Sequence, residues 1–104
     1  MQIWHLTDDA PRAPRRVRRG ERVILRVGTW PIEAGQWVWI TFDLQHLDGS
    51  VTTGRAEAGW QRNEAGNSYW AAEIGPFESG ERVTYTVYGR SPEGESQGPS
   101  PTFR

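Results

Sequence analysis

Residues 36–45 constrain the fold most strongly, because they have the pattern of one β-strand with two different faces. A strand points successive side chains to opposite faces, so one face of this segment is entirely apolar and is expected to face a core. The core face consists of Val38, Ile40, Phe42 and Leu44. The opposite face carries Trp37, Trp39, Thr41 and Asp43. Two tryptophans on a face that should be polar indicate a surface that the protein uses.

The rest of the chain repeats the strand pattern in short runs separated by turns that contain Gly or Pro. No segment shows the 3.6-residue apolar period of a helix. The pattern predicts strands at residues 3–6, 22–27, 37–45, 51–57, 68–74, 82–89 and 102–104. About seven short strands with frequent turns are typical of an immunoglobulin-like or fibronectin III-like, two-sheet antiparallel β-sandwich. A length of 104 residues fits a single all-β domain that spans residues 1–104.

The turns and the core follow from the same pattern. Asp48-Gly49 lies between two alternating runs and favours a type I′ hairpin, because both residues accept positive φ. Residues 65–67, Ala-Gly-Asn, can close a second hairpin in the same way. Trp60 follows a hairpin strand and is expected to close one end of the sandwich. Further core residues predicted from alternation are Val23, Leu25, Val27, Trp70, Ala72, Ile74, Val83, Tyr85 and Val87.

Composition excludes several kinds of function. The chain has no Cys, which removes disulfides, thiolate zinc sites and cysteine nucleophiles. A net charge of −1 gives no overall attraction to nucleic acid or to a membrane surface, so neither is an expected partner. No apolar run reaches the roughly 18 residues of a membrane span. The first residues lack the basic and apolar regions of a signal peptide.

Two segments differ from the strand-rich body. Residues 8–21 are rich in Arg and Pro, which indicates an extended lead-in along an edge of the sandwich. Its charge is either solvated or presented to a phosphate or an acidic partner. Residues 91–101 are rich in Pro, Gly and Ser and are predicted to form a loop. The chain ends in a strand-like run after this segment, which suggests that a longer protein continues with a further domain.

Catalysis by this chain alone is poorly supported. Its two histidines are His5, predicted as an edge residue of the first strand, and His46, predicted as an exposed residue beside a turn. The sequence contains no Gly-x-Ser-x-Gly elbow, and its neighbouring acidic residues fall in loops. No metal-binding spacing is present. We therefore expect no catalytic residue, no metal and no cofactor.

Tryptophan is unusually frequent, with six residues in 104. So small a core cannot hold all six at its centre, and an exposed indole offers a flat apolar face on which the C–H face of a pyranose ring stacks. On this hypothesis Trp37 and Trp39 bind glycan. Their predicted polar companions are Gln36, Thr41, Asp43 and Arg55. Two alternatives give the pair no ligand: contact with another domain, or coverage by the guanidinium of Arg16 or Arg18 from the lead-in.

Four stretches together resemble a known family. They are Gly-Glu-Arg-Val at residues 20–23, Asp48-Gly49, Tyr-Trp-Ala-Ala-Glu-Ile-Gly-Pro at residues 69–76, and Gly-Glu-Arg-Val-Thr-Tyr-Thr-Val at residues 80–87. Over roughly residues 14–104 the chain is similar to the immunoglobulin-like modules attached to bacterial carbohydrate-active enzymes. Such modules often precede the catalytic domain of α-glucosidase- and α-amylase-type hydrolases.

The resemblance implies a non-catalytic accessory module whose partners are a neighbouring catalytic domain and a glycan. Neither the Trp37/Trp39 pair nor Trp30-Pro31 belongs to the general pattern of these modules. No sugar-binding residue is therefore carried over from the family. The alternative is an immunoglobulin-like spacer or protein–protein interaction domain with no ligand of its own, because the same pattern occurs in spacers of many secreted bacterial proteins.

Overall fold

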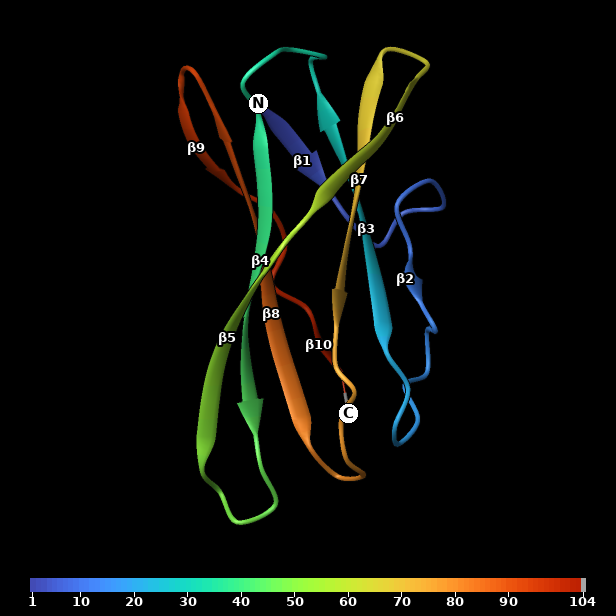
Figure 1. Ribbon diagram of the computed structural model, residues 1–104, viewed down its shortest axis with the longest axis vertical. Helices are drawn as coiled ribbons and strands as arrows, with labels where there is room; N and C mark the ends of the chain where they lie inside the picture. The colour runs from blue at the N-terminus through green and yellow to red at the C-terminus, as the bar shows by residue number, and fades with distance from the viewer. Residues whose placement is uncertain (104) are drawn as a thin grey trace.

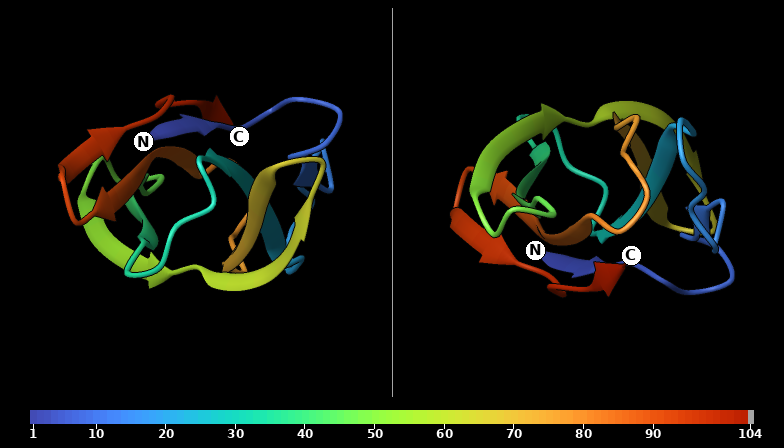
Figure 2. Two further views of the ribbon diagram at one scale, coloured as in Figure 1. Left: turned by 90° about the horizontal axis from the view of Figure 1, so that it is seen from above. Right: turned by 90° about the horizontal axis from the view of Figure 1, so that it is seen from below.

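The computed structural model describes residues 1–103, which form ten β-strands and no helix (Figure 1). The strands are β1 (Gln2–Trp4), β2 (Arg12–Ala13), β3 (Val23–Trp30), β4 (Trp37–Gln45), β5 (Val51–Glu57), β6 (Gly59–Glu64), β7 (Asn67–Ile74), β8 (Arg82–Ser91), β9 (Gly94–Gln97) and β10 (Thr102–Phe103). They form two antiparallel sheets packed face to face, which confirms the predicted all-β sandwich (Figure 2). Within residues 1–103 there is accordingly no helix long and apolar enough to cross a membrane.

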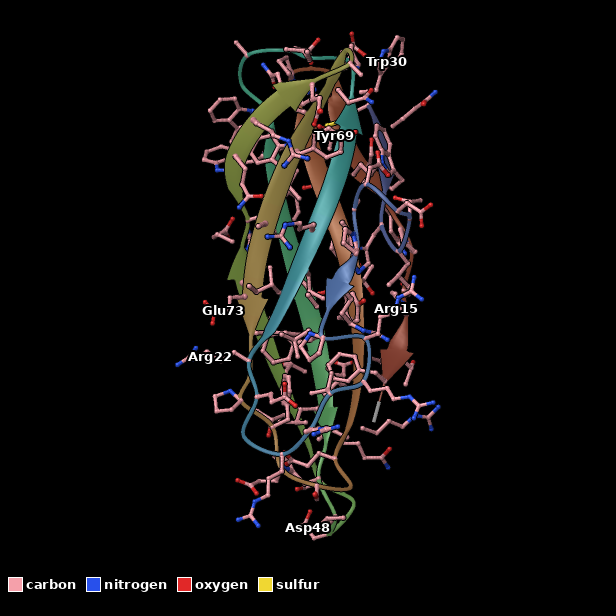
Figure 3. All side chains as sticks on the ribbon, turned by 90° about the vertical axis from the view of Figure 1, so that its right-hand side faces the viewer. Arg15, Arg22, Trp30, Asp48, Tyr69 and Glu73 are labelled. Atoms are coloured by element: carbon pink, nitrogen blue, oxygen red, sulfur yellow. The ribbon has the colours of Figure 1, made fainter. Side chains whose placement is uncertain are left out.

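Each sheet has five strands. The first has the order β1-β3-β7-β6, with β2 also paired to β3, and the second has the order β10-β8-β4-β5, with β9 also paired to β8. The longest pairing is that of β4 with β8, and both this pairing and that of β3 with β7 join strands far apart in the sequence. The molecule measures 43 Å along its longest axis. Trp30 and Asp48 lie near its two extremes, which we call the Trp30 end and the Asp48 end (Figure 3).

All seven predicted strands are present, with small differences at their ends. For the last one the structure gives Thr102–Phe103, and Arg104 lies outside the described residues. Three further strands, β2, β6 and β9, were not predicted. β9 lies in residues 91–101, so the prediction of a loop there is wrong: the turn after β8 continues into a paired strand. β6 shows no alternation because all six of its residues are exposed.

The two predicted hairpins form, but with different turns. The β4–β5 turn is not type I′, because Gly49 (φ 87°) has positive φ and Asp48 does not. There the Gly49 N–H donates to the His46 carbonyl (3.0 Å). In the β6–β7 turn both Ala65 (φ 51°) and Gly66 (φ 83°) have positive φ, as a type I′ turn requires.

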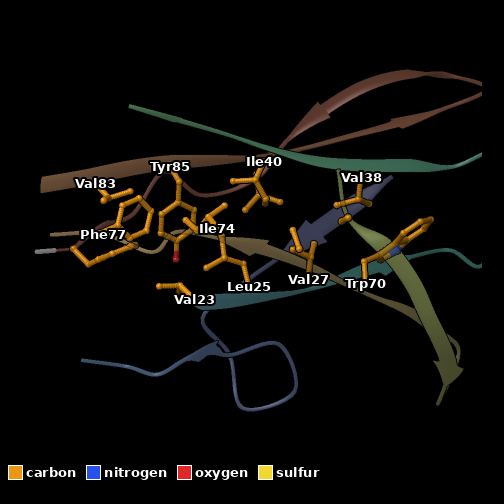
Figure 4. Close-up of a cluster of buried hydrophobic side chains, with 14 residues drawn as sticks. Val23, Leu25, Val27, Val38, Ile40, Trp70, Ile74, Phe77, Val83 and Tyr85 are labelled. Atoms are coloured by element: carbon orange, nitrogen blue, oxygen red, sulfur yellow. The ribbon is translucent and has the colours of Figure 1, made fainter. Parts of the chain in front are cut away.

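The core lies between the sheets and contains the residues predicted from alternation (Figure 4). Those with at most 8% of their surface exposed are Val23, Leu25, Val27, Val38, Ile40, Trp70, Ala72, Ile74, Val83, Tyr85 and Val87. Phe42 and Leu44 pack against this cluster but remain partly exposed. Phe77 and Phe103 complete it toward the Asp48 end, with ring centroids 5.8 Å apart. Burial of each large side chain contributes roughly 1.5–3 kcal/mol.

One extended segment, residues 51–64, belongs to both sheets. β5 pairs with β4 in the second sheet, and β6 pairs with β7 in the first. Between them Ala58 is 8% exposed, and its N–H donates to the Val38 carbonyl (2.9 Å). Figure 2 shows this segment along one side of the sandwich, with β1 and β10 along the opposite side. Trp60 lies on edge strand β6 with 56% of its surface exposed, so the prediction that it closes an end of the core is wrong.

The Arg- and Pro-rich lead-in packs beside β3 and β10. Its short strand β2 pairs with residues Ile24 and Leu25 of β3. The Arg12 guanidinium lies 4.9 Å from the centre of the Phe103 ring. Its Nη1 also donates to the hydroxyl of Tyr85 (3.3 Å). Arg12 therefore closes the side of the sandwich where the first sheet meets β10.

A series of hydrogen bonds runs from Arg12 through the Tyr85 hydroxyl and His5 to the backbone of β3 in the first sheet. His5 Nε2 lies 2.7 Å from the Tyr85 hydroxyl, and His5 Nδ1 lies 2.6 Å from the Arg26 carbonyl. A carbonyl only accepts, so Nδ1 carries the proton, and Nε2 of the neutral ring accepts the Tyr85 O–H. His5 was predicted to lie within the first strand, but it comes directly after edge strand β1 and is buried, with 6% exposed.

Candidate functional site

Trp37 and Trp39 both lie on the outer face of the second sheet, but they differ sharply in exposure. Trp37 is 62% exposed and Trp39 only 9%. The Trp39 ring stacks on Tyr88 of β8, with centroids 5.7 Å apart and an interplanar angle of 15°. From the other neighbouring strand, the Arg55 guanidinium lies 4.7 Å from the centre of the Trp39 ring. The expectation of two exposed indoles is therefore wrong for Trp39.

The covering arginine comes from β5 and not from the lead-in. Arg55 Nε donates to Glu57 Oε1 (2.7 Å), which holds the guanidinium over the indole. The lead-in packs against the other sheet through β2, so Trp39 is covered by a cross-strand contact and not by Arg16 or Arg18, as one alternative proposed. Arginine commonly stacks on indole in this way.

The end of β5 explains why Trp37 is left exposed. In the strand register Trp39 pairs with Glu57 on one side and with Tyr88 on the other. Trp37 pairs with Arg90 of β8, but β5 has already ended at Glu57. Beyond Ala58 the chain passes to the first sheet, so no neighbouring strand flanks Trp37 on that side.

These residues form an open groove of about 430 Å³ near the Trp30 end. It is lined by Trp37, Trp39, Arg55, Glu57, Ala58, Arg90 and Glu95. Two arginines and two glutamates give the lining no net charge. Arg90 and Glu95 are paired residues of the β8–β9 hairpin. We call this the Trp37 groove.

The groove contains some of the predicted site residues and lacks others. Trp37, Trp39 and Arg55 come together in it. Thr41 and Asp43 share the same face but lie four and six residues along β4, about 13 and 20 Å from Trp37 at 3.3 Å per residue. Gln36 is tied to the preceding loop, where its Nε2 donates to the Pro31 carbonyl (2.8 Å).

The lining residues that the sequence did not predict are Ala58 and the charged residues Glu57, Arg90 and Glu95. A hairpin centred on residues 91–94 would have placed Arg90 opposite Glu95. That signal is present in Ser-Pro-Glu-Gly, a turn sequence, but the Gly, Ser and Pro residues that follow it favour a loop.

His46 has a structural explanation at the Asp48 end. Its Nδ1 lies 2.6 Å from Glu81 Oε2 and its Nε2 lies 2.7 Å from Thr52 Oγ1. Glu81 also accepts the Glu78 N–H through Oε1 (2.7 Å), and this bond, followed by His46, lowers the pKa of the Glu81 carboxyl. His46 therefore links the β4–β5 hairpin to the β7–β8 turn and is partly buried.

Within residues 1–103, no group of three or more His, Cys, Asp or Glu side chains is arranged to hold a metal ion.

Comparison with known proteins adds the family. Residues 5–70 match the family described as Lmo2446-like, N-terminal. The chain is also 36% identical over 78 residues to the isomaltosyltransferase of Sporosarcina globispora. It belongs to the Lmo2446-like N-terminal family. The matched region is 75% of this chain and 7% of that enzyme, so the chain spans a small fraction of its relative's length.

Solved structures agree with this assignment. Protein lmo2446 from Listeria monocytogenes EGD-e, solved with α-D-glucose, β-D-glucose, magnesium and calcium, matches with a TM-score of 0.81 and 36% identity. The match covers 93% of this chain and 9% of that one. The cycloalternan-forming enzyme from Listeria monocytogenes, in complex with a pentasaccharide substrate, matches equally well. The chain thus corresponds to a small N-terminal domain found in carbohydrate-active enzymes, which fits the accessory module that the resemblance implied.

Proposed function

We propose that this domain is an accessory module that binds neutral glycan in the Trp37 groove. The observation that carries the proposal is the 62% exposed indole of Trp37 at the edge of a groove whose other aromatic ring is fixed. Relatives named as an isomaltosyltransferase and as a cycloalternan-forming enzyme make an oligosaccharide of glucose the ligand class to test first.

The chemistry of the groove suits a neutral sugar. The apolar face of a pyranose can stack on Trp37, as aromatic faces accept C–H surfaces. Arg90 can donate hydrogen bonds to hydroxyls, and Glu57 and Glu95 can accept them. A lining of two arginines and two glutamates favours neither an anionic nor a cationic ligand.

Part of the groove is held in place before any ligand binds. Trp39 stacks on Tyr88, and Arg55 is held by both Trp39 and Glu57. A fixed floor lowers the ordering cost of binding. Because the groove is shallow and has one free aromatic face, we expect dissociation constants of about 1 mM, equivalent to roughly −4 kcal/mol. A ligand would have to extend about 13 Å along β4 to reach Thr41 and further for Asp43.

A second candidate role is docking against a catalytic domain of the same polypeptide. Trp30 (50% exposed), Ile32 (47%) and Trp37 are exposed apolar side chains on or beside the β3–β4 loop. Exposed apolar surface of this kind is typical of contacts between domains. On this hypothesis the domain is a spacer or interaction module with no ligand of its own.

Titration of the 104-residue chain with isomaltose and with oligosaccharides of α- and β-glucan, followed by tryptophan fluorescence, tests the proposal. We expect a saturable change with an α-glucan ligand and at least about tenfold weaker binding in Trp37→Ala, since tenfold corresponds to about 1.4 kcal/mol. Trp60→Ala is the matched control, because Trp60 is also exposed (56%) but lies outside the groove. Unchanged binding in Trp37→Ala would overturn glycan binding at this groove, and no response to any glycan would in addition favour docking.

A further inference from the structure

We infer that the outer face of the first sheet holds a second sugar-binding site, formed by Gln2, Trp4, Trp30 and Asn67. These residues line a shallow pocket of about 290 Å³. They come from β1, the end of β3 and the start of β7, on the sheet opposite the one that carries the Trp37 groove. The class of ligand rests on the proposed function, whereas the site itself rests on separate residues.

Trp4 forms a rigid wall of this pocket. Its ring lies against the backbone of Gly28, where an added Cβ would overlap the indole. Its Nε1 donates to Asp9 Oδ2 (3.2 Å), and the ring meets Tyr69 edge-on, with centroids 6.5 Å apart. The position of the indole is therefore set by backbone, carboxylate and aromatic contacts together.

Asp9 helps to hold the Trp4 ring in place through three hydrogen bonds. It accepts hydrogen bonds from Thr7 Oγ1 (2.6 Å) and the Tyr69 hydroxyl (2.7 Å) as well as from Trp4. These bonds, Thr7 first, lower the pKa of the Asp9 carboxyl. Asp9 is therefore a positioning residue that acts through Trp4, and a ligand contacts the rings and amides beside it.

The rest of the pocket offers a free indole and two side-chain amides. Trp30 is 50% exposed and pairs with Gln2 in the β1–β3 register. Asn67 makes one long hydrogen bond, from Nδ2 to the Tyr69 hydroxyl (3.4 Å), so its carbonyl oxygen and second N–H are available to a ligand.

The chemistry of the pocket selects an uncharged ligand with many hydroxyls. No charged side chain lines it. An amide both donates and accepts, which matches a hydroxyl, and an indole face matches the C–H face of a sugar ring. A volume of about 290 Å³ lies at the lower end of the range for ligand sites, which fits one sugar ring better than a long oligosaccharide.

The test follows the six indole N–H signals of the ¹⁵N-labelled 104-residue chain by NMR during titration with isomaltose. We expect saturable shifts of the Trp4 and Trp30 signals. Gln2→Ala, which keeps both rings, should weaken the response of these two signals at least fivefold and leave that of Trp37 unchanged. Trp30→Ala should abolish the Trp4 response, and Trp60→Ala should change nothing.

The pattern of shifts distinguishes binding at the second site from binding in the Trp37 groove. Shifts of Trp37 without shifts of Trp4 and Trp30 would overturn the second site and leave the proposed function intact. The reverse pattern would support the second site and overturn the Trp37 groove. No shift of any indole signal would overturn both. Equal shifts with glycerol, an acyclic polyol, would also overturn the second site, because the site is argued from stacking of a ring.

Discussion

Gly28 shows how a single missing side chain shapes this domain. The Trp4 indole lies directly over it, in the space that any Cβ would fill. Gly28→Ala should displace the ring, weaken its bond to Asp9 and lower the free energy of unfolding by about 1–3 kcal/mol, the usual cost of overpacking. Urea denaturation measures the difference. Gly59→Ala is the control, because a Cβ at Gly59 meets nothing within 4 Å, and its stability should change by less than about 0.5 kcal/mol.

His5 makes the stability of the domain depend on pH. Burial, followed by the nearby charge of Arg12, lowers the pKa of His5 from 6.5 and outweighs the raising effect of the Arg26 carbonyl. Below about pH 6.5 the unfolded chain binds a proton at His5 that the folded chain does not. Stability from the neutral ring is thus present above that pH and is lost as pH falls toward the lowered pKa.

We therefore expect the stability of the natural chain to approach that of His5→Gln as the pH falls from about 8 to about 5. Urea midpoints measured for both proteins across this range give the result. His46 is present in both, so the comparison isolates His5. A difference that stays constant over the range would show that His5 does not change its protonation in this window.

At the scale of strands, alternation predicted those elements that have one buried and one exposed face. Val23, Val38, Trp70 and Val83 each belong to such a strand, and each is buried as predicted. β6 could not be found in this way, because as an exposed edge strand it has no core face. The local sequence pattern reports which side chains are buried, whereas β6 is placed by its backbone pairing with β7 and by exposed contacts such as that of Arg62 with the Tyr69 ring.

The candidate site required knowledge that the local pattern does not contain. Trp37 and Trp39 have the same place in the alternation, yet Trp39 is covered and Trp37 is free. The difference arises because β5 ends opposite Trp39. The strand order and the register, which depend on the whole fold, therefore decided which indole is available.

The two tryptophans Trp60 and Trp70 test this distinction between edge and core. They are directly paired across β6 and β7. Trp70 is 8% exposed and its Nε1 donates to Thr29 Oγ1 (3.0 Å), whereas Trp60 is 56% exposed. Trp70→Ala should lower stability by about 3–5 kcal/mol, and Trp60→Ala by less than about 0.5 kcal/mol. Chemical denaturation of both variants would contradict this account if their losses were similar.

At the scale of the whole molecule, the lead-in is a structural part of the sandwich. Arg12 packs its guanidinium on Phe103 and donates to Tyr85, which connects residues from both ends of the chain. Arg12→Ala should lower stability by about 1–3 kcal/mol, because it leaves the Tyr85 hydroxyl short of a donor and uncovers Phe103. Arg16→Ala, at an exposed position of the same segment, is the control and should be neutral. Thermal melts of both variants would show equal midpoints if the lead-in were only a solvated connector.

The segment that crosses at Ala58 makes the two sides of the sandwich unequal. On that side the sheets share an uninterrupted run of extended backbone, so they cannot separate there without breaking strand pairing. On the opposite side, where β1 and β10 lie, side chains such as Arg12 and Phe103 make the closure. Breaking side-chain contacts requires less free energy than breaking the paired backbone of two strands. We therefore expect the two sheets to separate first on the side of β1 and β10, while residues 51–64 keep them joined on the other side. Water should then first reach the core beside Phe103.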